Sequence, residues 1–257
     1  MKKTALITGA SSGIGKEMAI IHAETGGDLI VVARSENKLN DLKENLEKKY
    51  GVQVTVIAKD LSVPTAAQEI YDEVKAAGLT VDYLINNAGF GGQGCFHERA
   101  WEKDLAMINV NILALTNLTR LFLPEFVKRN SGKILNTSST ASYAPGPLQA
   151  VYYATKAYVT SFSNALSVEL EETDITVTAL LPGATQSGFA GTSGMDKTDL
   201  FKNSAPADAV ARDGYNAMLK GKMDVISGIS PLLINILAMM PKKLVMRRIK
   251  KQQQVKV

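Results

Sequence analysis

"TGASSGIG", residues 8–15, is the stretch that decides the fold of this 257-residue chain. It follows a short apolar run at 5–8 and opens a stretch with helical spacing of apolar residues. Glycine lets a backbone turn tightly and approach a ligand, and the N-terminus of the next helix stabilises negative charge. This strand–turn–helix order predicts a dinucleotide pyrophosphate site, although the spacing G-x-x-x-G-x-G is not the usual one; a plain Gly/Ser loop is the alternative. The expected contacts are Gly9, Ser11, Ser12, Gly13, Ile14 and Gly15.

Short apolar runs alternate with long helical patterns along the rest of the chain. Several runs are rich in Val and Ile without alternation, as in strands buried on both faces. The order predicts an α/β, single-domain, doubly wound Rossmann fold over residues 1–230, with a parallel sheet of about seven strands and helices on both faces. An apolar-then-basic extension follows at 231–257. The expected strands are 5–8, 29–33, 52–57, 83–85, 133–136 and 175–180, and the expected helices about 13–26, 36–49, 64–77, 98–129 and 152–172.

The composition is that of a globular protein with a sizeable core, at 46% hydrophobic and 21% charged residues. The single cysteine, Cys95, excludes an internal disulfide framework and favours a reducing, cytoplasmic location. The net charge of +4 comes from the tail: residues 241–257 hold seven cations and no acid, and the remainder holds 22 basic against 25 acidic residues. We therefore predict no nucleic-acid partner. Because one cysteine could not build a cysteine-rich metal site, we also predict no metal. No apolar run approaches the roughly 20 residues of a membrane span.

The end of the second expected strand carries a cation. Arg34 follows Ala33, Lys38 comes one helical turn later, and the first acid is Glu36. A carboxylate at this place accepts hydrogen bonds from the 2′-hydroxyl of NAD, whereas an arginine accommodates the 2′-phosphate of NADP. We therefore expect NADP(H) to be preferred over NAD(H), with Arg34 as a phosphate contact. The alternative is that Arg34 is a solvated surface charge.

A tyrosine and a lysine four residues apart, Tyr152 and Lys156, stand in "VYYATKAY". At this spacing they share a helix face. They follow "ILNTSSTAS", a strand whose end carries Ser138 and Ser139, and α/β enzymes place their chemistry at the carboxyl ends of strands. A lysine cation stabilises a neighbouring phenolate and lowers the pKa of the tyrosine toward the working pH. We therefore expect Tyr152 to be a general acid and Lys156 its partner.

The other tyrosines near a lysine are weaker candidates. Tyr71 and Lys75 repeat the spacing, but on an outer helix that is far in sequence from the glycine turn. Tyr153 is rotated by about 100° from Tyr152 around the helix axis, and Tyr158 does not share the face of the lysine closely. We interpret Tyr71 as structural and the other two as packing residues.

Five motifs in order resemble the classical short-chain dehydrogenase/reductase family, of the NADPH-preferring type, over essentially residues 1–230. Beside the glycine turn, the sequence has "NNAG" at 86–89 and "LLPGATQS" at 180–187. It also has Ser139 thirteen residues before Tyr152, and "NVNILALTNLTRLFLP", in which Asn111 stands thirteen residues before Pro124. That last spacing favours Asn111 over the neighbouring Asn109.

The resemblance implies a catalytic tetrad of Asn111, Ser139, Tyr152 and Lys156. Ser139 would polarise the substrate carbonyl, and Asn111 would hold a water in a proton path to Lys156, which would also bind the nicotinamide ribose. The resemblance further implies cofactor contacts at the ends of other strands. These are Asp60, Leu61, Asn87, Ala88, Gly89, Tyr152, Lys156, Pro182, Gly183, Thr185 and Ser187.

The expected activity is NADPH-dependent reduction of a ketone or aldehyde on a fairly apolar substrate, with Tyr152 as the general acid. A 3-oxoacyl thioester, a steroid-like ketone and a xenobiotic carbonyl all remain open as substrates. The alternatives are a non-catalytic NADP(H)-binding sensor or scaffold and an epimerase or dehydratase. A lid at about 187–205 would supply an apolar ceiling through Phe189, Met195, Leu200 and Phe201. We interpret His97 and Trp101 as structural, and His22 as a packing or surface residue.

Two expectations concern surfaces. The long helices around Asn111 and Tyr152 carry apolar residues on more than one face, so we expect a homodimer or homotetramer, as is common in the family. In the tail, a helical stripe precedes the basic end. It is either a helix that covers the pocket or a subunit interface, followed by a frayed end, or a peripheral membrane element. The stripe consists of Leu233, Ile236, Leu237, Met240 and Leu244.

Overall fold

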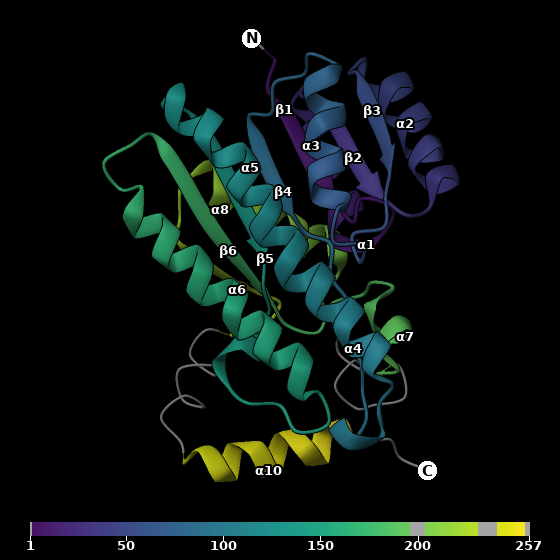
Figure 1. Cartoon of the computed structure of the whole chain (residues 1–257), viewed down its shortest axis with the longest axis vertical. Coiled ribbons are helices and arrows are strands. Elements are labelled where there is room, and N and C mark those ends of the chain that lie inside the picture. Colours follow the sequence, from purple (N-terminus) through teal and green to yellow (C-terminus); the bar gives the residue numbers. More distant parts are fainter. Residues whose placement is uncertain (1, 196–203, 231–240, 255–257) are drawn as a thin grey trace.

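The computed structural model describes residues 2–195, 204–230 and 241–254. Its centre is a seven-stranded, wholly parallel sheet with the order β3-β2-β1-β4-β5-β6-β7 (Figure 1). The chain moves outward from β1 in one direction and then restarts beside it with β4. The ends of β1 and β4 are therefore the point at which a doubly wound sheet binds ligands. The strands are β1 (Thr4–Thr8), β2 (Asp28–Ala33), β3 (Val54–Ala58), β4 (Tyr83–Asn86), β5 (Gly132–Thr137), β6 (Ile175–Pro182) and β7 (Asp224–Ser227).

Helices cover both faces of this sheet, and two apolar cores result. Alternate residues of β2 show the division: Leu29 and Val31 belong to one core, and Ile30 and Val32 to the other. The first core includes α1 (Gly13–Glu24), α2 (Glu36–Tyr50) and α8 (Ala207–Leu219). The second includes α3 (Ala66–Ala76) and α5 (Leu115–Lys128), which Figure 1 shows in front of the sheet together with α6 (Ala150–Glu169). The doubly wound fold predicted from the sequence is confirmed.

The expected elements are present with shifted ends, and several, among them β7 and α8, were not located from the sequence. Strand β7 has only four residues, and its apolar run is too short to be recognised as a strand from the sequence. Helix α8, which precedes it, was not assigned either. The helix expected at 98–129 begins at Trp101 as α4 (Trp101–Ile108) and continues into α5 through a π-helical turn, η2 (Asn109–Ala114). A widened turn of this kind inserts one residue and often marks a functional position.

The continuous run Trp101–Lys128 is long and apolar enough by composition to cross a membrane, which corrects the expectation that no run approaches that length. Of the most apolar 18-residue stretch of this run, 44% is buried inside the fold. Val110, Phe122 and Phe126 from this run belong to the second core, so its apolar character already serves the packing of the sheet.

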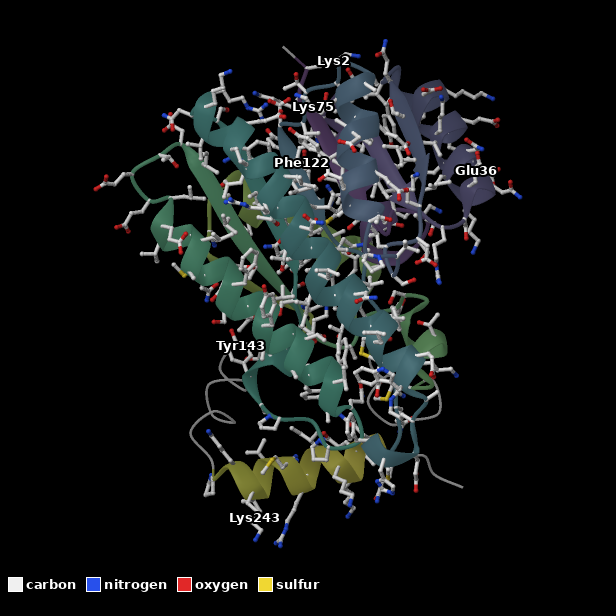
Figure 2. The ribbon with its side chains drawn as sticks, viewed as in Figure 1. Lys2, Glu36, Lys75, Phe122, Tyr143 and Lys243 are labelled. Carbon is white, nitrogen blue, oxygen red and sulfur yellow. The ribbon has the colours of Figure 1, made fainter. Side chains whose placement is uncertain are left out.

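The basic tail is helical where the structure describes it. Helix α10 (Lys242–Gln253) lies at the lower end of the molecule in Figure 1, away from the sheet, and Lys243 points outward from it in Figure 2. The frayed end predicted for this region is therefore wrong for residues 242–253. Of the predicted apolar stripe, Leu233, Ile236, Leu237 and Met240 lie outside the described residues, and Leu244 is exposed on α10.

Candidate active site

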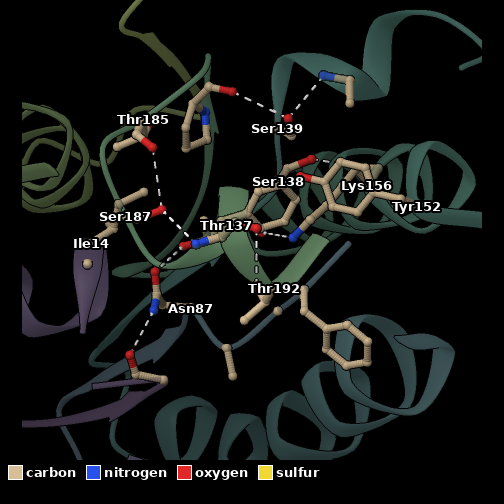
Figure 3. Close-up of a pocket in the computed structure, with 18 of the residues that line it drawn as sticks. Ile14, Asn87, Thr137, Ser138, Ser139, Tyr152, Lys156, Thr185, Ser187 and Thr192 are labelled. Carbon is tan, nitrogen blue, oxygen red and sulfur yellow. Dashed lines mark hydrogen bonds between the residues drawn. The ribbon is translucent and has the colours of Figure 1, made fainter. Parts of the chain in front are cut away.

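A cavity of about 700 Å³ runs along the carboxyl ends of the strands. It begins at the glycine turn after β1, passes the ends of β4 and β5, and reaches the side chains of α6 and α10. Figure 3 shows this arrangement, with Ile14 and Ser187 on one side and Tyr152 and Lys156 on the other. Of the predicted site residues, all line the cavity except Gly15 and Asn111, which lie directly behind its wall.

The glycine turn has the shape that a phosphate cradle requires. Gly9 and Gly13 have φ angles of +68° and +55°, a backbone region that favours glycine. Gly15 is buried, and a Cβ there would lie 2.5 Å from the carbonyl oxygen of Gly9 and 2.4 Å from Nδ2 of Asn87. The prediction that Gly15 contacts the cofactor therefore needs correction: its role is to let α1 pack closely against the turn. The first turn of α1 carries no acidic side chain, so its N-terminus is open to an anion.

Thr8 joins the glycine turn to the loop after β4, a role that sequence reasoning missed. Its hydroxyl accepts hydrogen bonds from the backbone N–H groups of Asn87 and Ala88, both at 3.0 Å. In return, Nδ2 of Asn87 donates to the carbonyl oxygen of Thr8 at 3.1 Å. These bonds fix the two loops at the point where the strand order reverses. Thr8 is the first letter of the glycine motif, so its place in the motif was the available signal.

Cations and an acid border the cavity at the end of β2 and β3. Arg34 is exposed and lines the cavity, as predicted. Lys59 lines it too, but its ammonium is already paired with Glu69 and Glu73, each at 2.9 Å. Burial opposes ionisation of Asp60, yet hydrogen bonds from Ser62 and the nearby Arg34 hold the pKa of Asp60 below its ordinary value. Arg34 is thus the cation at this end with room for an added phosphate.

The predicted tyrosine and lysine are both buried on α6. The Nζ of Lys156 donates to the carbonyl oxygen of Thr137 at 2.8 Å and lies 5.9 Å from the centre of the Tyr152 ring. Burial lowers the pKa of Lys156 to about 8. Burial also raises the pKa of Tyr152, and a hydrogen bond with Ser139 offsets part of that rise. The expectation that the lysine lowers the pKa of Tyr152 is not met here, because desolvation dominates and the ammonium is directed at Thr137.

The two neighbouring serines have different surroundings. Ser138 donates to the backbone oxygen of Lys156 at 2.9 Å, so its hydroxyl holds α6 against the end of β5. The hydroxyl of Ser139, in contrast, donates to the carbonyl oxygen of Pro182 at 3.4 Å, accepts from the N–H of Ala141 at 3.1 Å, and lies close enough to Tyr152 to lower the pKa of that tyrosine. Of the two serines, Ser139 is therefore the one whose hydroxyl affects Tyr152.

Asn111 sits in the π-helical turn and supports the site from behind. Its side chain exchanges two hydrogen bonds with the backbone of Phe90, at 3.0 and 3.1 Å, and donates to Thr155 at 3.0 Å. A Cβ on Gly89 would lie 3.1 Å from Oδ1 of Asn111 and 3.3 Å from Nζ of Lys156. Both polar groups therefore lie close to the backbone of Gly89. Asn109 instead donates to the carbonyl oxygen of Ser62, which supports the choice of Asn111 between the two.

The other part of the cavity is lined mainly by apolar and aromatic side chains. The ring of Phe189, from the predicted lid, lies 5.2 Å from the ring of Tyr152, and Met195 also lines the space. Leu200 and Phe201 lie outside the described residues. Tyr153 also lines the cavity, so its interpretation as a packing residue was incomplete. Sequence reasoning missed several further lining residues, among them Tyr143, Gln149, Val245, Ile249 and Gln252.

The remaining candidates lie away from the cavity. His97 and Trp101 are exposed and do not line it. His22 is buried behind the sheet, with Nδ1 at 2.7 Å from the Tyr215 hydroxyl. Tyr71 donates to Glu125 at 2.7 Å and packs against Phe122, so it joins α3 to α5, as expected of a structural residue. Within residues 2–195, 204–230 and 241–254, no group of three or more His, Cys, Asp or Glu side chains could hold a metal ion.

Comparison with known proteins finds clear relatives. A family model described as short chain dehydrogenase matches residues 3–198. Very-long-chain 3-oxoacyl-CoA reductase from Rattus norvegicus is 38% identical over 186 residues, and the protein of that name from Homo sapiens is 36% identical. The matched segment covers 69% of this chain but only 58% of each of these two relatives.

Solved structures match over almost the whole chain. A short-chain dehydrogenase from Sphingobium yanoikuyae in complex with NADPH has a TM-score of 0.82 and 30% identity, and the match covers 93% of this chain and 97% of that one. A 7beta-hydroxysteroid dehydrogenase has a TM-score of 0.86 and 25% identity, with 96% of both chains covered.

Proposed function

Because the chain belongs to the short-chain dehydrogenase family, we propose that it is an NADPH-dependent reductase that converts a carbonyl group on an apolar substrate to an alcohol. The observation that carries the proposal is that Tyr152 and Ser139 line the same cavity, with Ser139 close enough to affect the pKa of Tyr152, and that this cavity continues to the glycine turn. A dinucleotide bound along the strand ends would bring its reactive end to that pair.

The residues present fit such a dinucleotide. Gly9, Gly13 and the open N-terminus of α1 would hold the pyrophosphate, and Arg34 the 2′-phosphate. The loop of Asn87, Ala88 and Gly89 would lie along the nucleotide, and the turn at Pro182–Ser187 would close over it. When bound, NADPH supplies the hydride, and the protein supplies its position and the proton. That a structural neighbour is in complex with NADPH supports this cofactor.

The chain's own residues account for the proton and for the orientation of the substrate. Ser139 would donate a hydrogen bond to the carbonyl oxygen and fix it against Tyr152. The ordinary pKa of a tyrosine already lies above neutral pH, and burial raises the pKa of Tyr152 further, so its hydroxyl carries the proton that a general acid needs. Lys156, with a pKa of about 8, carries a proton that can be lost and regained near neutral pH. Lys156 would stabilise the tyrosinate that is left after Tyr152 has given up its proton. Asn111 would hold a water that returns a proton to Lys156.

The substrate class is proposed from the wall of the cavity. Beyond Tyr152 the lining includes the apolar side chains of Phe189, Met195, Val245 and Ile249, with polar groups such as Gln149 and Gln252 between them. This mixture suits a long or bulky apolar body that carries a few polar groups. The very-long-chain 3-oxoacyl-CoA reductases are consistent with an acyl chain in this space, and the 7beta-hydroxysteroid dehydrogenase with a fused-ring ketone.

A panel of carbonyl compounds, followed by the loss of NADPH absorbance, tests the proposal. It should contain 3-oxoacyl thioesters of increasing chain length, steroid ketones and small polar ketones. We expect kcat/KM to rise with apolar length or ring number. Turnover of the small polar ketones alone would contradict the apolar substrate class. NADPH binding without turnover of any compound would favour the non-catalytic sensor instead.

A further inference from the structure

Helix α10 has two chemically different faces. Val245 is buried, and Val245, Ile249 and Gln252, spaced as one helix face, line the cavity. Every cation of the helix is exposed, and none forms an ion pair with any side chain in the described parts of the chain. The six cations are Lys242, Lys243, Arg247, Arg248, Lys250 and Lys251. Helix α10 thus forms part of the cavity wall with one face and exposes six unpaired cations to the outside.

A buried glutamine fixes this helix to the rest of the molecule. Gln253 is 1% exposed, and its Nε2 donates to the Tyr153 hydroxyl at 2.7 Å. The backbone carbonyl oxygen of Gln253 accepts a hydrogen bond from the side chain of Gln93, and the backbone carbonyl oxygen of Gln93 accepts from Arg99 at 2.8 Å. The basic face therefore has a defined place next to the segment between β4 and α4, as Figure 1 shows.

That adjoining segment exposes large apolar side chains. Phe96, in the short helix η1 (Phe96–Glu98), is 62% exposed, and Trp101, at the start of α4, is 56% exposed. On α10 itself, Leu244 is 53% exposed between the cations. Exposed aromatic residues next to lysine and arginine are the combination that binds the surface of a lipid bilayer: the cations meet anionic headgroups, and the aromatic rings enter the interfacial layer.

We propose that α10 and the segment 93–101 form a docking face for an anionic membrane, placed so that the cavity adjoins the bilayer surface. The charge complementarity of six unpaired cations selects an anionic leaflet, and the exposed Phe96, Trp101 and Leu244 provide the apolar contact. An apolar substrate dissolved in the membrane then has a short path past α10 to Tyr152. The last point rests on the proposed function; the docking itself does not, and it is measured without turnover.

The chain has one tryptophan, Trp101, which makes a direct test possible. The full chain is mixed at low salt with vesicles of phosphatidylcholine alone or of phosphatidylcholine and phosphatidylglycerol in equal parts. We expect co-sedimentation with the anionic vesicles only, reversal by salt, and a shift of the Trp101 emission to shorter wavelength. Absence of binding at low salt would overturn the proposal, and so would binding that leaves the emission of Trp101 unchanged.

Matched charge variants separate this face from net charge. Lys243→Glu with Lys251→Glu reverses two charges on α10, and Lys48→Glu with Lys128→Glu reverses two exposed charges on α2 and α5. The α10 pair should lower partitioning by at least about 25-fold, since each cation near an anionic surface contributes about fivefold. The distant pair should lower it far less. An equal loss in both pairs would overturn the proposal.

Two further arms guard the interpretation. Lys243→Gln with Lys251→Gln only neutralises the two charges and should give intermediate vesicle binding. If the charge-reversed pair does not fold, the neutral pair serves as the test in its place. Unchanged vesicle binding of the neutral pair would then refute the proposal. Inorganic pyrophosphate tests whether α10 instead binds a soluble phosphate group. If pyrophosphate releases the chain from vesicles no more than chloride does at the same ionic strength, the result supports the membrane. Tight binding of pyrophosphate by a chain that does not bind vesicles contradicts the proposal.

Discussion

Replacement of Arg34 by alanine tests the choice of cofactor. Arg34 lines the cavity at the end of β2, and Lys59, the neighbouring cation of the cavity wall, is held by Glu69 and Glu73. Lys59 therefore cannot readily replace the lost charge. A charge-assisted hydrogen bond contributes about 1.5–3 kcal/mol, and the exposure of Arg34 places it toward the lower end of that range. We expect the Kd for NADPH to rise about 10- to 30-fold.

Calorimetric titration measures this without knowledge of the substrate. The Kd for NADH should hardly change in the Arg34→Ala variant, because NADH has no 2′-phosphate. Lys38→Ala is the matched control, since Lys38 is exposed, lies one turn further along α2 and does not line the cavity. Equal affinity of the unchanged protein for NADPH and NADH, or an equal loss for both in Arg34→Ala, would refute the assignment.

Three more predictions concern stability, the glycine turn and assembly. Burial lowers the pKa of His22, so as the pH falls the unfolded chain takes up a proton on this histidine before the folded chain does. The contribution of neutral His22 to the free energy of unfolding is therefore complete above about pH 6.5. It is lost as the pH falls below that value, by up to about 1.4 kcal/mol per pH unit. Urea titrations of His22→Gln should lose this pH dependence, whereas those of the exposed His97→Gln should keep it. Gly15→Ala should weaken NADPH binding at least about tenfold because its Cβ would lie 2.5 Å from a backbone oxygen, while Gly191→Ala, which meets nothing within 4 Å, should not. Light scattering should find a dimer or tetramer, since the α4–η2–α5 run and α6 leave Leu113, Tyr158 and Val168 exposed; a monomer at micromolar concentration would count against it.

The parts of the site that the sequence could predict are local or lie at strand ends. Tyr152 and Lys156 are one helical turn apart, so their shared face follows from the helix alone. Ser139 and Asn87 follow strands of a parallel sheet, whose carboxyl ends meet at one edge whatever the lengths of the loops. The apolar runs that define those strands were visible because the strands are buried on both faces.

What could not be predicted depends on contacts between distant segments. The bond between Gln253 and Tyr153 joins residues 100 positions apart, and no periodicity in either segment indicates it. The predicted apolar stripe of the tail ran from Leu233 to Leu244, yet the residues that line the cavity, Val245 and Ile249, were not part of it and stand between the cations of the basic stretch. The pKa of Tyr152 was misjudged for a related reason, since the degree of burial is a property of the whole fold.

Single-substitution kinetics on Tyr152 test the central claim most directly. With the best compound of the carbonyl panel, Tyr152→Phe should lower kcat by about 10²–10⁴, the usual contribution of a general acid, and should leave the Kd for NADPH unchanged. Tyr158→Phe, a change on the same helix at an exposed position that does not line the cavity, should keep normal turnover. Full activity of Tyr152→Phe, or an equal loss in both variants, would contradict the account.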